Sequence, residues 1–521
     1  MAAFKELNME NVSFIKKLNR GKNCYADHMS TDELQLIHIT SRLESIIPEM
    51  LDKGKIIFLT GNPGDGKTFI IKALDEVIKR HNAFVETDAN NQSAYNDLIN
   101  NIISCYDEGR PAIIAINEYP FLQLRKQMKE ASTIIFDEII VAKKNAITYD
   151  TSFDLKNRIV IIDLNERNLL DPDNHIISTL FDRFIELLRS QSNPSKALSY
   201  NLKALSIPEI KDQVLSLFQL VATECEHFAV RDILGAFSFF LTACETDDYE
   251  NERYYSTIFT GDNILLKAIQ QFDPIYLSLP ELDEKLWNGE ISLGWIIETP
   301  TQWPCSNEFN DSPEEALACF KEIKRRYYFE NVKGLELVRL QPSEINECAR
   351  LFTSYDTQKK KTKERFVRAI NKLFLPSLDD KHKLHIWTTH RYDISISAPV
   401  AVSSKAVYSS ELELLMPRPA DWLKGLEYLP DHFILRPKNA TSPSLRLDID
   451  FIRTLIAVEN GYPINLLASH FEQAASRFLR ELDSKGFSEE NDDGEIIIAD
   501  RSQSSCFKMN IQDDKYGFSE D

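Results

Sequence analysis

The residues of this chain that most directly predict chemistry form one short stretch, Gly61 to Thr68 (GNPGDGKT). The stretch fits the pattern G-x-x-x-x-G-K-[ST], in which glycines let successive backbone N–H groups surround the phosphates of a nucleotide. In such a loop the lysine reaches the β- and γ-phosphate oxygens and the final hydroxyl ligates Mg²⁺. The stretch therefore predicts ATP and Mg²⁺ as cofactors. The expected nucleotide-binding residues are Gly61, Asn62, Pro63, Gly64, Asp65, Gly66, Lys67, Thr68 and Phe69.

A phosphate-binding loop is positioned by a strand before it and a helix after it, and the sequence predicts both. Residues 55–60 are apolar and β-rich, and residues 69–81 carry apolar side chains at helical spacing. Three further apolar runs, 83–87, 112–116 and 158–164, alternate with helical segments. Such alternation is typical of a parallel sheet that is covered on both faces. We therefore expect an α/β fold, a P-loop NTPase core with a helical lid.

A nucleotide-hydrolysing site also needs an acidic residue that orients or deprotonates the attacking water. Glu118 is the preferred catalytic base, because it follows the apolar strand 112–116. Glu138 and Asp163 remain alternatives. Around Glu138, residues 134–149 are interpreted as an inserted β-hairpin.

Two more side chains are expected to contact the γ-phosphate or its metal. Asn117 takes the position of a metal-holding acid, so we expect it to hold Mg²⁺ through water, beside Thr68. Asn165 follows the strand 158–164 and is placed to sense the γ-phosphate.

Two arginines are candidates for stabilising the charge of the leaving group. Arg183 lies where an arginine finger acting on a second subunit is often found; the alternative is an ion pair with Asp182 or Glu186 on a helix surface. Arg231 begins an apolar helix and could swing onto the γ-phosphate from the lid, or simply be solvated there.

Over the first 250 residues the order of these features is similar to that of AAA+-type ATPases. Within that class the chain resembles the DptF-like ATPases of bacterial DNA-phosphorothioation-dependent restriction and related phage-defence ATPases. The resemblance depends on residues 59–68, 88–90, 114–118, 161–168, 272–274 with 282–283, and 324–329. It implies an anti-phage defence role, with other defence-system proteins as partners.

A locally basic region follows the predicted lid. From Lys321 to Lys372 there are fourteen Lys or Arg residues against seven acids, in a chain whose formal net charge is −20. The densest part is Lys359–Arg368, which we interpret as a possible DNA-backbone contact; a solvated helix face is the alternative. Tyr327, Tyr328 and Phe329 could stack on bases or belong to a core.

The sequence predicts four parts. They are a nucleotide-binding core at 1–190, a helical lid at 191–250, a mainly helical region at 251–375 and a C-terminal α+β module at 376–521. We expect residues 487–500 and the last nine to be loose. No metal site is expected at His382, His385 and His390, because no cysteine or carboxylate stands nearby at ligand spacing.

Composition narrows the class of protein. An acidic chain with widely spaced cysteines and no apolar run long enough to span a bilayer is expected to be cytoplasmic and to have no membrane partner. A GTPase is disfavoured, because no Asn-Lys-x-Asp guanine motif follows a strand. The leading hypothesis is an ATPase that acts on DNA or partner proteins, with a homo-oligomer as one of its candidate assemblies. The alternative is a slow nucleotide-gated scaffold that recruits an effector.

Overall fold

The structure is a computed structural model of the 521-residue chain. It describes residues 11–19, 29–90, 95–149, 157–171, 175–190, 194–222, 227–246, 252–306, 309, 312–334, 343–390, 400–491, 494–501, 505–512 and 515–520. The chain forms two compact units. Unit 1 comprises Met1–Leu340 with Arg418–Leu429, and unit 2 comprises Gln341–Pro417 with Pro430–Asp521.

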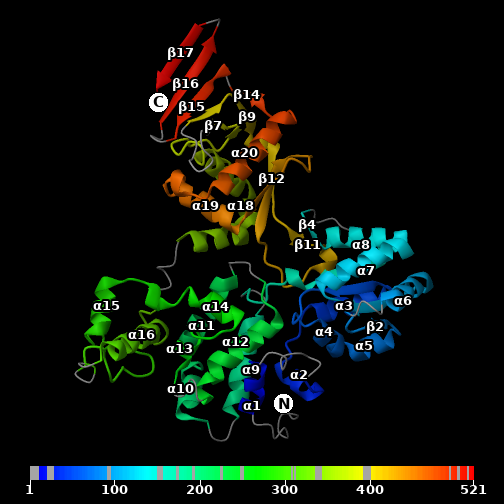
Figure 1. The fold of residues 1–521 in the computed structure, drawn as a ribbon, viewed down its shortest axis with the longest axis vertical. Coiled ribbons are helices and arrows are strands. Elements are labelled where there is room, and N and C mark those ends of the chain that lie inside the picture. Colours follow the sequence, from blue (N-terminus) through cyan, green and yellow to red (C-terminus); the bar gives the residue numbers. More distant parts are fainter. Residues whose placement is uncertain are drawn as a thin grey trace. The chain divides into compact units, whose positions relative to one another are not determined.

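Unit 1 contains a four-stranded parallel sheet (Figure 1). Its strands, in the order in which they pair, are β2 (Phe84–Glu86), β3 (Ala112–Ala115), β1 (Ile56–Thr60) and β5 (Ile159–Asp163). In open α/β sheets, ligands bind outside the carboxyl ends of the strands. Because the four strands are parallel, the segments that follow them lie at the same edge of this sheet.

Helices cover both faces of this sheet, as predicted. Alternate residues of β1 are buried in two different cores, one on each face. Ile56 and Phe58 pack in one core with helices α6 (Tyr95–Glu108), α7 (Glu118–Ala131) and α8 (Thr133–Ala146). Ile57 and Leu59 pack in another core. That second core includes helices α3 (Leu43–Asp52), α4 (Lys67–Ala73) and α5 (Asp75–Arg80).

The β-hairpin predicted around Glu138 is wrong, because this segment is helix α8. Its buried residues Ile135, Ile139 and Ala142 recur at helical spacing and pack in the same core as Ile56 and Phe58 of β1. The hydroxyl of Ser132 caps the helix by accepting a hydrogen bond from the Ile135 amide. Only the short strand β4 (Ile147–Thr148) follows it, and β4 pairs with β11 (Arg418–Pro419).

The other helices of unit 1 share one large apolar core, in which Phe181, Phe218 and Phe237 pack together. The predicted lid is thus continuous with the helices on either side of it. The members are α1 (Asn11–Leu18), α2 (Thr31–Ile37), α9 (Ile176–Arg189), α10 (Lys196–Ala204), α11 (Pro208–Ala222), α12 (Val230–Thr242), α13 (Tyr254–Thr257), α14 (Ile264–Gln270), α15 (Pro280–Trp287) and α16 (Pro313–Glu330). Short 3₁₀ turns are η4 (Leu164–Glu166), η6 (Ala243–Glu245), η8 (Pro274–Tyr276) and η11 (Asp421–Leu423).

Unit 2 combines three helices with antiparallel strands, in agreement with the α+β character expected for the C-terminal module. The helices are α18 (Ser343–Lys372), α19 (Ile449–Glu459) and α20 (Ser469–Ser484). One sheet has the order β10 (Leu412–Leu415), β12 (His432–Pro437), β13 (Leu445–Asp448). A second has the order β14 (Glu489–Glu490), β9 (Lys405–Tyr408), β6 (Lys383–His385). The third has the order β17 (Lys515–Glu520), β16 (Ser505–Gln512), β15 (Ile496–Asp500), β8 (Val400–Ser403), β7 (Thr388–His390).

The expectation that the acidic C-terminal stretches are loose is wrong for their described residues. Strand β15 alternates between buried Ile497 and Ala499 and more exposed neighbours, the pattern of a half-buried strand. Strands β16 and β17 then pair in antiparallel fashion. The prediction was based on the acidic residues of these stretches, and this composition did not indicate that they pair as strands.

No described helix has both the length and the apolar character that a membrane span requires. The described cysteines are free thiols, four of them buried: Cys105, Cys244, Cys348 and Cys506.

Candidate functional site

The segment Gly61–Thr68, here called the glycine-rich loop, connects β1 to α4. Gly61, Gly64 and Gly66 have φ values of +142°, +102° and +88°, a region of backbone space that favours glycine. A Cβ at Gly61 would also lie 2.5 Å from the carboxylate of Asp65. The loop therefore requires glycine for its backbone path and for the space inside it.

Lys67 lies at the start of α4 and is only 8% exposed. Its ammonium donates to the carbonyls of Gly61 and Asn62, at 3.0 and 2.7 Å. Burial lowers the pKa of Lys67, while the charges of Asp65, Asp163 and Asp88 act in the opposite direction. The Lys67 ammonium is thus bonded to carbonyls of the loop's own backbone. The oxygens of a bound anion would compete with these carbonyls for the ammonium.

Asp65 is buried inside the loop and connects it to the segment before α12. Its carboxylate accepts hydrogen bonds from the Asn62 amide and from Nε2 of His227, which lies 2.8 Å away. Burial lowers the pKa of His227, but the hydrogen bond and charge of Asp65, with the Arg167 carbonyl and Asp163, raise it overall. No local sequence pattern could identify this pair, since the two residues are 162 positions apart.

Asn165 lies in η4, just after β5, and joins the glycine-rich loop to the start of α7. Its side-chain oxygen accepts from the Asn62 amide at 3.1 Å, and its side-chain nitrogen lies 3.5 Å from Glu118 Oε2. Glu118 is half-exposed, with Lys143 at 3.7 Å. The two residues predicted to sense the γ-phosphate and to act as base are therefore neighbours beside the loop.

The two alternative bases have different surroundings. Glu138 accepts hydrogen bonds from the Tyr106 hydroxyl and from the amides of Arg158 and Ile159, so its carboxylate is fully used in fastening α8 to β5. Asp163 accepts from the Asn165 amide and caps η4. Of the three candidates, Glu118 is the one whose carboxylate is about half exposed and lies next to the side-chain nitrogen of Asn165.

Asn117 and Thr68, the residues predicted to hold Mg²⁺, line the same cavity. Asn117 is the N-cap residue of α7 and its side chain makes no capping bond. Its amide donates to Asn90, whose side-chain nitrogen in turn donates to Asp88. Asp88 also lines the cavity, and the sequence analysis included it only among residues 88–90 of the family resemblance. Its position directly after β2 was the signal that could have identified it.

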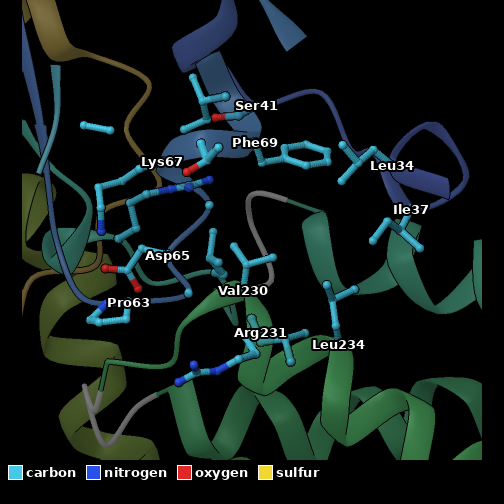
Figure 2. A pocket seen from close by; sticks show the side chains of 18 of the residues that line it. Leu34, Ile37, Ser41, Pro63, Asp65, Lys67, Phe69, Val230, Arg231 and Leu234 are labelled. Atoms are coloured by element: carbon cyan, nitrogen blue, oxygen red, sulfur yellow. The ribbon is translucent and has the colours of Figure 1, made fainter. Parts of the chain in front are cut away.

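A cavity of about 260 Å³ opens in front of the loop, far more than the roughly 30 Å³ that a single water occupies. One side is polar and includes the loop, as Figure 2 shows for Asp65 and Lys67. The other side is apolar. Its residues include Met29, Leu34, Ile37, Ile39, Phe69, Ile176, Leu180, Val230 and Leu234. Phe69, predicted to contact the nucleotide, stacks on His38 with ring centroids 4.9 Å apart.

The structure distinguishes the two candidate arginines. Arg231 lines the cavity from the start of α12, its amide donating to the Gly64 carbonyl at 3.3 Å. Arg183 lies in α9, where its guanidinium donates to the carbonyl of His38. Of the two acids considered as ion-pair partners of Arg183, Asp182 pairs with Lys211 instead. Of the two, Arg231 is the one that lines the cavity.

Part of the basic region is neutralised by ion pairs within each unit. In unit 1, Lys324, Arg325 and Arg326 pair with Asp283, Asp273 and Glu330, and Tyr327, Tyr328 and Phe329 are buried in the core. The aromatic residues therefore do not form an exposed stacking surface.

In unit 2, Arg365 and Arg368 both pair with Glu459, and Lys363 donates to two backbone carbonyls. Lys359, Lys360 and Lys361 remain exposed on α18. Among the described residues, no three His, Cys, Asp or Glu side chains form a group that could hold a metal.

Comparison of the chain with protein-family models, with curated proteins and with solved structures found no match.

Proposed function

We propose that unit 1 binds ATP with Mg²⁺ and hydrolyses it. One observation supports this proposal above all: the glycine-rich loop with Lys67, and Arg231, line the polar part of a cavity whose other part is apolar, and Asn165 is hydrogen-bonded to the same loop. A nucleoside triphosphate has the same division between charged phosphates and a flat, weakly polar base. The site and this ligand therefore match in chemistry from end to end.

At the polar end, the amides of the loop and the ammonium of Lys67 would bind the β- and γ-phosphates. Lys67 would exchange its bonds to the Gly61 and Asn62 carbonyls for phosphate oxygens. Arg231 would reach the same phosphates from α12. Both cations favour a highly charged anion over a neutral ligand.

The donors around the loop also suit Mg²⁺, which prefers oxygen ligands and retains waters. The Thr68 hydroxyl and the Asp88 carboxylate, together with phosphate oxygens, would hold the ion, and the Asn117 side chain could contact its waters. When bound, the ion would neutralise charge on the β- and γ-phosphates.

For hydrolysis, Glu118 would take the proton of a water whose oxygen attacks the γ-phosphorus. The bond to the oxygen bridging the β- and γ-phosphates would break, which releases ADP and phosphate. Asn165, which contacts both the loop and Glu118, would hold the γ-phosphate and the water in line. In this scheme Glu118 and Asn165 orient the reacting groups and transfer a proton, and neither forms a covalent bond with phosphorus.

At the apolar end, the purine would lie among side chains such as Leu34, Ile37 and Leu234, which Figure 2 shows on the side of the cavity opposite Asp65. We propose adenine as the base, since these residues offer it apolar contacts.

The biological setting follows from the resemblance to DptF-like ATPases alone. We propose that ATP turnover serves a bacterial anti-phage or DNA restriction system, through DNA or partner proteins. Lys359–Lys361 would supply the DNA contact. The alternative, a slow nucleotide-gated scaffold, is favoured by Asn117, which replaces a metal-holding acid and would slow turnover.

The test is Mg-ATP binding and steady-state hydrolysis by the full chain, with GTP as the competing nucleotide. We expect Lys67→Ala to abolish binding, and Glu118→Gln to bind ATP normally but to hydrolyse it about 100-fold or more slowly. Lys79→Ala, an exposed lysine of α5, is the matched control and should behave as wild type. Wild-type turnover equal to that of Glu118→Gln would favour the scaffold, and absence of ATP binding would reject the proposal.

A further inference from the structure

The segment Arg418–Leu429, here called the strap, belongs to unit 1 although the chain on both sides of it belongs to unit 2. It connects β10 and β12, which pair with each other in antiparallel register. The connection between two neighbouring strands is therefore not a free surface loop.

The strap is built into the core of unit 1. Strand β11 pairs with β4, and the Ala420 amide donates to the Ala146 carbonyl at 2.9 Å. Leu423 and Leu426 are buried in the same core as Ile57 and Leu59 of β1. Such burial fixes the strap directly behind the strand that leads into the glycine-rich loop.

Glu427 is the polar anchor of the strap, with its side chain 5% exposed. Its carboxylate accepts from the Ser41 hydroxyl at 2.9 Å and from Nε of Arg167 at 2.8 Å. Its backbone carbonyl accepts from the Asn168 amide at 2.6 Å. A buried carboxylate with this many donors is held in one geometry, and it holds its partners equally firmly.

Both side chains that Glu427 binds line the cavity. Ser41 comes from the segment before α3, and Arg167 follows Asn165 by two residues, immediately after η4. The Arg167 carbonyl in turn lies beside His227, the partner of Asp65. One side chain of the strap thus fixes the loop that carries the proposed γ-phosphate sensor.

We propose that Glu427 is a positioning residue of the nucleotide site: through Arg167 it sets the position of Asn165 relative to Glu118 and the γ-phosphate. This inference rests on the proposed ATPase function and extends it to a residue that lies 260 positions from its partner. It also gives the C-terminal half of the chain a part in the reaction. Truncation before the strap would remove that part.

The experiment measures Mg-ATP affinity and kcat for the full chain carrying Glu427→Gln, Asn165→Ala, or both. Glu427→Gln should lower kcat by about 10- to 100-fold, because a small displacement of an orienting group is enough, while affinity changes little. If Glu427 acts through Asn165, the double variant should be no slower than Asn165→Ala alone. A purely structural role would instead give multiplied losses in kcat.

Glu413→Gln is the matched control. Glu413 lies in β10 of unit 2 and pairs with Arg436 of β12 at 2.7 Å, so Glu413→Gln removes a Glu–Arg ion pair that does not belong to unit 1. Its kcat should equal that of wild type. Should Glu427→Gln fail to fold, Arg167→Lys carries the same test, because lysine keeps the charge but has no Nε donor.

The outcomes separate this inference from the proposed function. Wild-type protein that does not bind Mg-ATP overturns both. Wild-type protein that hydrolyses ATP, with independent effects of Glu427→Gln and Asn165→Ala, overturns only the role of Glu427. Loss of kcat in Glu413→Gln equal to that in Glu427→Gln does the same.

Discussion

Lys67 of the glycine-rich loop and Arg326 of α16 are both largely buried cations, but different groups surround the two charges. Lys67 donates to two backbone carbonyls and faces a cavity. Arg326 donates to Glu330, whose side chain is fully buried and is also bonded by the hydroxyls of Tyr200 and Tyr254. Lys67 can exchange its partners for a ligand, whereas Arg326 cannot leave without stranding a buried carboxylate.

The difference shows which sequence signals indicate function. Lys67 was identified from a spacing that constrains the backbone around it. The basic region was identified from a count of charges, and a count does not reveal the acids that approach from elsewhere in the chain. Asp273 and Asp283, for example, lie about fifty and forty residues before the cations that they neutralise. The following predictions test this comparison.

The largest effect on stability is expected for Arg326→Ala. It removes the cation from the buried Glu330, and breaking such a buried pair costs about 3–5 kcal/mol. ATP affinity of the folded protein should remain unchanged, because α16 does not line the cavity. Urea unfolding measures the loss, and Lys321→Ala, at an exposed position of the same helix, should change stability by less than about 0.5 kcal/mol. Equal losses in both variants would contradict the distinction drawn here.

The next largest effect is expected for Arg231→Ala, and it concerns catalytic activity rather than the free energy of unfolding. Removing a cation that faces the phosphates should lower kcat/KM for Mg-ATP by about 100-fold, or roughly 2.7 kcal/mol. Arg183→Ala should lose less than about tenfold, since Arg183 supports only the His38 carbonyl. Steady-state kinetics of the two variants decide between the arginines. A larger loss for Arg183 would show that it acts on phosphate, in the same or a second subunit.

The sequence could predict some parts of the fold and of the candidate site, but not others. Parallel strands, their order of appearance and the loop were predictable, because buried strands and glycine-rich turns leave local patterns. The β-hairpin around Glu138 was a wrong prediction, since Ile134–Val141 has an apolar run that suits either strand or helix, and packing against β5 decided for helix. Asp65–His227 and Arg167–Glu427 could not be predicted, because each pair joins residues far apart in sequence and depends on the finished fold.

A pH effect is expected at the contact between Asp65 and His227. The pKa of His227 is raised in the folded protein, because Asp65, the Arg167 carbonyl and Asp163 together outweigh burial. Its contribution to stability is therefore complete below the unfolded pKa of about 6.5 and is lost as pH rises through the higher folded value. Unfolding free energies of wild type and His227→Gln, measured between about pH 6 and pH 9, should converge as pH increases. A difference that grows with pH would contradict the assignment.

The smallest effect on folding is expected where the basic region is still exposed. Lys359 lies over the Tyr355 ring and Lys360 lies 3.8 Å from Glu364, contacts that contribute little at an exposed surface. Replacing Lys359, Lys360 and Lys361 with glutamine should therefore leave stability within about 0.5 kcal/mol for each residue. If the three lysines contact DNA phosphates, the slope of log affinity against log salt should fall by up to about 0.9 for each lysine lost. Unchanged DNA affinity at low salt would show that these lysines form a solvated helix face and do not contact DNA. Among the described cations, those at the cavity of unit 1 would then be the ones still proposed to contact phosphate.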